Sequence, residues 1–166
     1  MMSLSQRGLA LIAEHEGKIV QNNLHCMYDD ATGKIITKYD DANGYPTIGY
    51  GHLITEEEKK QGLYLKGIDE THARELLMCD ANNAVNAVNK FVKVPLNQDQ
   101  FDALVSFTFN VGSGSLKSST LLKLLNSGKY NEAANQFLRW NKFKGQPLAG
   151  LTNRRKKERA LFLSEI

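Results

Sequence analysis

The sequence predicts an α+β fold with a small antiparallel β-sheet lobe and a helical-bundle lobe, joined by a long helix. Two observations predict this class. Residues 18–54 combine turn residues with β-branched residues, which favours short hairpins. From Thr55 onward, apolar residues recur at helical spacing, and capping residues separate the runs. The chain has 166 residues, which is enough to bury the core of one domain.

The boundaries of the two lobes follow from where this pattern changes. We expect the β-sheet lobe at residues 17–68, with an inserted hairpin at about 18–38. We expect the helical lobe to consist of residues 1–16 and 69–166. Within it, an apolar stripe of helical period predicts that the linking helix runs over about 69–92.

The formal charge of +3 is small but unevenly distributed. Residues 1–70 contain seven Lys or Arg and eleven Asp or Glu, a net charge of −4, which leaves +7 for the other 96 residues. A basic half suits a polyanionic partner such as nucleic acid, an anionic membrane or an acidic wall polymer. Ordinary solubility explains so small an excess of basic residues equally well.

The two cysteines and the apolar runs indicate where the protein is made. Cys26 and Cys79 form neither a disulfide framework nor a metal-binding spacing, so two buried free thiols are expected. The N-terminal part has only one short apolar run, and no stretch reaches the length of a transmembrane helix. We therefore expect synthesis in a cytoplasm, with no signal peptide and no membrane insertion.

A first helix should carry a functional carboxyl group. Ser3 or Ser5 can cap its start, and Gly17 is expected to end it. Glu16 falls on the apolar face of this helix, where a half-buried carboxyl group is a candidate general acid. The alternative, an exposed glutamate in a fraying last turn, is the commoner fate of a Glu before Gly.

Residues 39–52 have the composition of a functional site rather than of a core. The pair Asn43-Gly44 predicts a hairpin turn, across which Asp41 and Thr47 should face one another. The alternatives are an aspartate that caps its own loop and a threonine that only pairs in the ladder. Residues 28–33 nearly repeat residues 39–44, which indicates a local duplication or an extra hairpin.

Capping residues define the helical lobe. Thr55 with Glu58 and Asn97 with Gln100 form capping boxes, and Asn131 is expected to cap a later helix. The last helix carries a basic run, which we expect to be a solvated face rather than a specific phosphate site. Its members are Arg154, Arg155, Lys156, Lys157 and Arg159.

Glu16, Asp41 and Thr47 together suggest glycoside cleavage. A helix end that packs against a small sheet would place Glu16 opposite the hairpin that carries the other two residues. Two carboxyl groups in unlike surroundings suit this chemistry, because one donates a proton to the leaving oxygen and the other activates water or attacks the sugar. Thr47 could hold the water from a second side.

These motifs resemble those of the phage-type lysozymes, the endolysin muramidases. The site motif is Glu16-Gly17 followed by Tyr39-x-Asp41-x-x-Gly44-x-x-Thr47-Ile48-Gly49-Tyr50-Gly51-His52. The helical lobe adds residues 100–107, Phe109-Asn110-Val111-Gly112, residues 118–122, Phe137-x-x-Trp140 and Gly150-Leu151-x-x-Arg154-Arg155-x-x-Glu158-x-x-Leu161-Phe162. Apart from residues 18–38, the resemblance covers nearly the whole chain.

The resemblance implies a lysozyme-like fold and hydrolysis of the β-1,4 bond between N-acetylmuramic acid and N-acetylglucosamine in peptidoglycan, without metal or cofactor. It implies that Glu16 is the proton donor, Asp41 the second carboxylate and Thr47 the residue that places water, in an inverting reaction. His52 would be structural, tying the sheet to the first helix and helping to orient Glu16. Phe109 and Asn110 match positions that line the saccharide groove.

One spacing departs from the family pattern. The family's aspartate usually follows its glutamate after about one short strand, whereas Glu16 and Asp41 are 25 positions apart. Either an extra hairpin precedes the usual aspartate, or Asp30 in the first copy supplies it. We favour Asp41, because Asp41 and Thr47 keep the family spacing, while Ile36 stands six residues after Asp30.

Competing functions remain open at this point. A lytic transglycosylase cuts the same bond with one glutamate and no water, and a wall-degrading effector could be delivered to competing bacteria. A wall-binding module without catalysis would use the basic last helix, whereas nucleic-acid binding lacks a supporting motif. We expect a monomer that binds peptidoglycan strands, with release to the periplasm through a holin and lysis of the host as its role.

Overall fold

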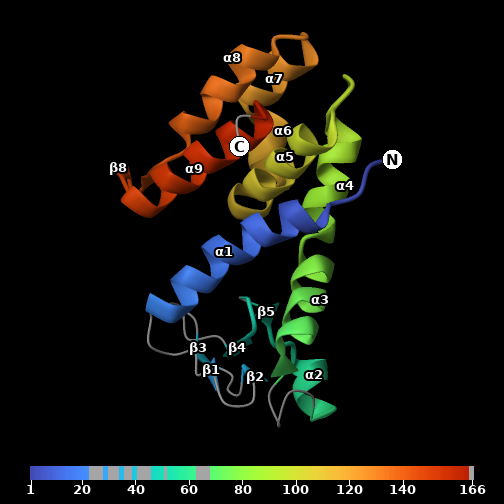
Figure 1. Cartoon of the computed structure of the whole chain (residues 1–166), viewed down its shortest axis with the longest axis vertical. Helices are drawn as coiled ribbons and strands as arrows, with labels where there is room; N and C mark the ends of the chain where they lie inside the picture. Colours follow the sequence, from blue (N-terminus) through green and yellow to red (C-terminus); the bar gives the residue numbers. More distant parts are fainter. Residues whose placement is uncertain are drawn as a thin grey trace. The chain divides into compact units, whose positions relative to one another are not determined.

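The structure of the protein is a computed structural model (Figure 1). It describes residues 1–22, 28–29, 34–35, 39–40, 46–50, 52–62 and 68–164. These residues form two compact units. One unit contains residues 10–80, and the other combines residues 1–9 with residues 81–166. The division falls inside the first helix, α1 (Gln6–Asn22), which therefore contributes residues to both units.

The start of α1 was predicted correctly, but its predicted end was wrong. Ser5 caps the helix, because its Oγ accepts a hydrogen bond from the backbone N–H of Gly8 at 3.2 Å. The helix continues through Gly17 to Asn22. A glycine inside a helix costs only about 1 kcal/mol relative to alanine, so it does not end a helix by itself. Glu16 consequently lies within a regular helix rather than at its end.

The described residues of the unit 10–80 form two small antiparallel sheets, the helices α2 and α3 and the larger part of α1. The strand order of one sheet is β1-β2-β6, and that of the other is β3-β4-β5. The elements are β1 (Tyr28–Asp29), β2 (Lys34–Ile35), β3 (Tyr39–Asp40), β4 (Pro46–Ile48), β5 (His52–Leu53), α2 (Glu56–Lys60), β6 (Ile68–Asp69) and α3 (Glu70–Asp80). A hairpin thus lies within residues 18–38, and it pairs with β6 rather than standing alone.

The register of the second hairpin corrects one expectation. Thr47 pairs with Tyr39 across β3 and β4, and Pro46 pairs with Asp40. In the ladder, Thr47 is therefore paired with Tyr39. The predicted position of the turn had suggested Asp41 as the residue opposite Thr47.

The second unit is a helical bundle around α5. Its elements are α4 (Asn82–Phe91), α5 (Gln98–Val111), α6 (Ser113–Ser118), α7 (Thr120–Asn126), α8 (Tyr130–Gln136), the 3-10 helix η1 (Phe137–Arg139), β7 (Lys142–Phe143), β8 (Gln146–Pro147) and α9 (Ala149–Phe162). Residues 101–108 of α5 are all buried, and α5 packs against α4 and α9 (Figure 1). The core position of this helix was predicted from its apolar density.

An aromatic cluster joins three elements of this bundle. The ring of Phe107 on α5 meets the rings of Phe137 and Trp140 at centroid distances of 5.2 and 5.5 Å, edge to face. Phe137 in turn meets Phe162 of α9 at 5.6 Å. Edge-to-face contacts of this kind contribute beyond the area they bury, so they fix η1 and α9 against the core helix.

Two predicted capping boxes are present, and other boundaries differ from the prediction. Thr55 with Glu58 caps α2, and Asn97 with Gln100 caps α5. Asn131, in contrast, lies inside the first turn of α8, which begins one residue earlier at Tyr130. Where one linking helix was expected over about 69–92, the structure has α3 and α4 with a turn between them.

The free thiol of Cys79 is exposed, so the expectation that it is buried was wrong. The buried face of α3 is set by Ala73 and Leu77, which are four residues apart. Cys79 follows Leu77 by two positions and therefore leaves that face. Cys26 lies outside the described residues.

Among the described helices, none combines the length and the apolar character that a membrane span requires.

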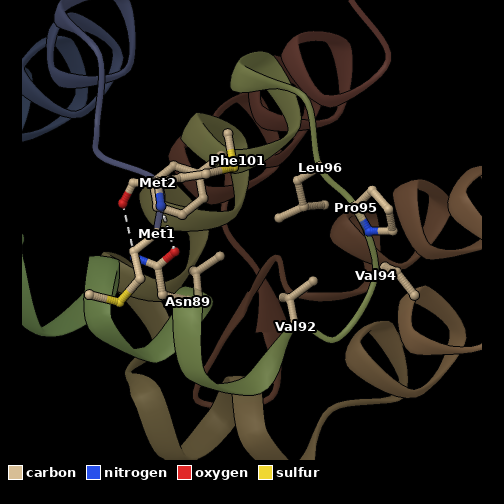
Figure 2. Close-up of a pocket in the computed structure, with 9 residues that line it drawn as sticks. Met1, Met2, Asn89, Val92, Val94, Pro95, Leu96 and Phe101 are labelled. Carbon is tan, nitrogen blue, oxygen red and sulfur yellow. Dashed lines mark hydrogen bonds between the residues drawn. The ribbon is translucent and has the colours of Figure 1, made fainter.

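Polar side chains of the bundle hold the N-terminal segment. The side chain of Asn89 accepts a hydrogen bond from the backbone N–H of Met2 at 3.0 Å and donates one to its carbonyl at 2.9 Å (Figure 2). Gln98 donates to the carbonyl of Ser3 at 2.8 Å. Met1 and Met2 line a pocket of about 220 Å³ together with residues of α4 and α5 (Figure 2).

The buried carboxylate of Asp102 completes this attachment. It accepts hydrogen bonds from the backbone N–H of Ser5 at 3.1 Å, from the Ser5 hydroxyl, and from Gln98 at 2.9 Å. Gly8 lies directly against it, because a Cβ atom at Gly8 would stand 2.6 Å from Asp102 Cγ. The first turn of α1 can therefore approach α5 only without a side chain at position 8.

This contact predicts that Gly8→Ala destabilises the protein by about 1–3 kcal/mol, the usual cost of overpacking a core. Urea-induced unfolding measures the change. The matched control is Gly114→Ala in α6, where an added Cβ meets nothing within 4 Å. There the better helix propensity of alanine should leave stability unchanged or raise it by up to about 1 kcal/mol. Equal effects at the two positions would contradict the prediction.

Candidate active site

Glu16 is the predicted proton donor, and it is half-buried on α1. A regular helix fixes the backbone of Glu16 more firmly than a fraying last turn would, which suits a group that must hold one position. Thr47 lies in β4 of the same unit. Asp41 and its alternative Asp30 lie outside the described residues, so the choice between them stays a prediction.

His52 stands between two carboxylates in the unit of residues 10–80. Its Nδ1 lies 2.9 Å from an oxygen of Asp80 on α3, and its Nε2 lies 3.0 Å from an oxygen of Glu58 on α2. Both ring nitrogens are therefore directed at carboxylates, which favours the doubly protonated ring. His52 thus connects β5 with α2 and α3, while its predicted connection to the first helix stays a prediction.

The electrostatic setting of His52 follows from this geometry. Burial lowers the pKa of His52, but the hydrogen bonds and charges of Asp80 and Glu58 together outweigh burial and raise it above its ordinary value. Burial also raises the pKa of Asp80, although His52 opposes that shift. Charged His52 therefore holds the two carboxylates at the end of the sheet.

The basic run of the last helix is only partly solvated. Lys156 and Lys157 are exposed, as predicted, whereas Arg154 and Arg155 are 2% and 1% exposed. The prediction of a solvated face was therefore wrong for these two arginines. The helical period explains the difference, because residues 154, 155 and 158 share one face of α9 and residues 156 and 157 lie on another.

Glu158 is the acid that compensates the two buried arginines. Its Oε2 accepts hydrogen bonds from Arg154 Nε at 3.2 Å and from the Ser106 hydroxyl at 2.5 Å. Arg155 Nη1 pairs with its Oε1. A buried charge without a partner would cost several kcal/mol, so this cluster needs all its members. It binds α9 to the middle of α5.

Arg155 also reaches Asn110, a residue predicted to bind substrate. Its Nη2 donates to Asn110 Oδ1, its Nε donates to the carbonyl of Trp140 at 2.9 Å, and its guanidinium lies 5.1 Å from the centroid of the Phe107 ring. Burial lowers the pKa of Arg155, and the carboxylate of Glu158 opposes the shift. Asn110 is exposed and Phe109 is half-buried, both in the last turn of α5.

Sequence reasoning did not assign a role to Arg155. The available signal was the spacing of Arg155 and Glu158, since residues three apart on a helix can pair.

Among the described residues, no group of three or more His, Cys, Asp or Glu side chains lies close enough together to hold a metal ion.

Comparison with known proteins assigns the family. The family model described as phage lysozyme matches residues 30–158. The chain belongs to this family. The match covers residues 30–80 of the sheet unit and residues 81–158 of the helical bundle, so both parts of the chain agree with the assignment. The resemblance inferred from the sequence motifs is confirmed.

Individual relatives support the assignment to the phage lysozyme family. It is 43% identical to an endolysin of Bacillus phage B103, over 98% of this chain and 55% of the relative. The endolysin of Salmonella phage P22 is 36% identical over 99% of this chain and its own full length. The chain thus spans about half the length of the curated Bacillus phage relatives that it matches.

A solved structure shows the same fold. A crystal structure of a P22 lysozyme variant superposes with a TM-score of 0.78 at 34% sequence identity, and the match covers 98% of this chain and 99% of that structure. The predicted α+β, lysozyme-like fold class is therefore confirmed.

The contacts of His52 predict a pH dependence of stability. A histidine with a raised folded-state pKa stabilises the protein fully below its unfolded pKa of about 6.5, and this contribution declines as pH rises through the raised value. His52→Gln should therefore destabilise by about 1–3 kcal/mol at pH 6 and by less at pH 9. Urea-induced unfolding at the two pH values measures the difference.

A second variant checks the cause of this trend. Asp80→Asn removes a charge that raises the pKa of His52, so it should shrink the pH dependence. If His52→Gln cost the same free energy at both pH values, charged His52 would not hold this end of the sheet.

Proposed function

We propose that the protein is a muramidase of the endolysin type. It hydrolyses the β-1,4 bond between N-acetylmuramic acid and N-acetylglucosamine in peptidoglycan. Membership of the phage lysozyme family is the observation that carries the proposal. The half-buried position of Glu16 on a regular helix supports it, because a general acid needs a fixed carboxyl group that is only partly hydrated.

In the proposed mechanism Glu16 donates its proton to the glycosidic oxygen, and the bond from that oxygen to the anomeric carbon breaks. Asp41 takes a proton from a water molecule, which attacks the anomeric carbon from the opposite face. Thr47 holds this water through its hydroxyl group. The product is inverted, which requires the two carboxyl groups to stand about 6.5–9.5 Å apart, with room for the water. No cofactor enters this scheme.

The remaining roles are proposed on the same basis. Phe109 and Asn110 contact the saccharide, and His52 supports the sheet that carries Thr47. The protein acts as a monomer on peptidoglycan strands, without nucleic acid and without membrane insertion. It reaches the wall after synthesis in the host cytoplasm, through a holin, and its action lyses the host.

Glu16→Gln tests the proton donor. Its amide cannot protonate a leaving oxygen, so the rate of hydrolysis should fall by at least about 100-fold. Release of reducing ends from purified peptidoglycan measures the rate. Glu14→Gln is the matched control, because Glu14 is an exposed carboxylate two residues earlier on the same helix, and it should keep nearly full activity. Wild-type rates for Glu16→Gln would exclude the proposed acid.

A paired experiment identifies the second carboxylate and the reaction type. Asp41→Asn should abolish hydrolysis of purified wall, whereas Asp30→Asn should retain it, because only Asp41 keeps the family spacing to Thr47. Loss of activity in Asp30→Asn alone would transfer the role to Asp30.

Mass spectrometry of the products should show reducing muramic acid ends, while anhydro ends would identify a lytic transglycosylase.

A further inference from the structure

Three exposed lysines gather where α4 ends and α6 packs against it (Figure 1). Lys90 lies in the last turn of α4, Lys93 follows that helix, and Lys117 lies on α6. All three belong to one compact unit. We call them the lysine face. None of them takes part in the proposed hydrolysis or in the proposed saccharide contact.

The ring of Phe91 brings two of these charges together. Lys90 Nζ lies 5.6 Å and Lys117 Nζ lies 5.8 Å from its centroid. An ammonium group is attracted to the face of an aromatic ring, which offsets part of the repulsion between the two lysines. Two cations from different helices are therefore held near a single point of the surface.

Hydrogen bonds fix the segment that carries the third lysine. Lys93 Nζ donates to the carbonyl of Lys90 at 2.8 Å, so this ammonium group stays at the end of α4. The side chain of Asn126 on α7 accepts from the backbone N–H of Lys93 at 2.7 Å and donates to the carbonyl of Phe91 at 3.0 Å. The lysine face is therefore built on a braced backbone.

Acidic side chains do not compensate the lysine face. Residues 81–131 contain only two acids, Asp99 and Asp102. Asp99 pairs with Arg7, and Asp102 is buried and bonded to Ser5. In the part of the chain that the structure describes, none of the three lysines forms an ion pair. The lysine face thus keeps its charge for an anionic partner.

The composition of the lysine face narrows the choice of anion. All of its cations are lysines, which act as point charges and meet a phosphate from any direction, whereas the planar arginine fork suits base edges. Phe91 is half-buried beneath two ammonium groups, so no exposed ring offers a base a stacking partner. The face also has no exposed apolar side chain to anchor it in lipid.

We propose that the lysine face binds a phosphodiester polymer of the bacterial wall, a flexible chain of polyol phosphates. Such a chain carries one negative charge per repeat and no rings, so its successive phosphates can reach Lys90, Lys93 and Lys117. The contact retains the protein at the wall between cuts. The lysine face is separate from the proposed active site, but the choice of a wall polymer rests on the proposed function.

Calorimetric titration of the full-length protein with soluble poly(glycerol phosphate) tests the proposal. We expect saturable binding that weakens as salt is added, because salt screens exposed charges. In Lys90→Gln/Lys93→Gln/Lys117→Gln the Kd should rise about tenfold, since each exposed charge contributes a modest attraction. The corresponding triple arginine variant keeps the charges, and its Kd should stay near that of the wild type.

A matched variant separates the lysine face from net charge. Lys60→Gln/Lys144→Gln/Lys156→Gln also removes three exposed lysines, but these lie elsewhere on the chain. Its Kd should stay near that of the wild type. Urea-induced unfolding should give all three triple variants midpoints close to that of the wild type, because every substituted side chain is exposed.

Four results would overturn the proposal. They are the absence of saturable binding, an equal loss in the two glutamine variants, tighter binding of DNA with the same number of phosphates, and tighter binding of vesicles that contain phosphatidylglycerol. The last two would assign the face to nucleic acid or to a membrane. The titration does not depend on hydrolysis, so a failure of the muramidase proposal in the Glu16 assay would be recognised separately.

Discussion

The ion pairs that Glu158 makes inside the helical bundle are the constraint on which that unit depends. Two guanidinium groups and one carboxylate are buried there. Buried charges are tolerated only if each of them is paired and hydrogen-bonded. Ser106 on α5 supplies the remaining hydrogen bond to the carboxylate. Because the members come from α5 and α9, the cluster specifies how these two helices meet.

The same cluster links the core to the surface that we assign to substrate. Arg155 uses one end of its fork on Glu158 and another on Asn110, so a buried charge determines the orientation of an exposed amide. Its contact with the carbonyl of Trp140 places the chain where η1 ends and the β7–β8 hairpin begins. The stability of the bundle and the orientation of Asn110 therefore both depend on Arg155.

Much of this fold could be predicted from local patterns, and the failures have physical causes. The capping boxes at Thr55 and Asn97 were predictable because cap and partner are three residues apart and need no tertiary contact. The end of α1 was mispredicted because Gly17 weakens a helix without stopping it. Arg154 and Arg155 were predicted to be solvated because their burial depends on α5, which covers this face of α9 and brings Ser106 to Glu158.

The candidate site shows the same limit. Glu16 and Thr47 could be singled out because the motifs that contain them resemble those of a known family, whereas Arg155 has no role until its contact with Asn110 is seen. Likewise, nothing in the sequence separates Asn89, which binds Met2 through both backbone groups, from the other asparagines of α4. Long-range hydrogen bonds of this kind leave no local pattern.

The attachment of the N-terminal segment has a consequence for biosynthesis. Ser5 finds its partner 97 residues later, at Asp102, and Met2 finds its own 87 residues later, at Asn89. A ribosome must therefore deliver well over half of the chain before the first turn of α1 can dock, although the strands β3, β4 and β5 pair only with their neighbours in the sequence. Contacts so distant in sequence form slowly, and the start of the chain should be among the last parts to become ordered in a growing polypeptide.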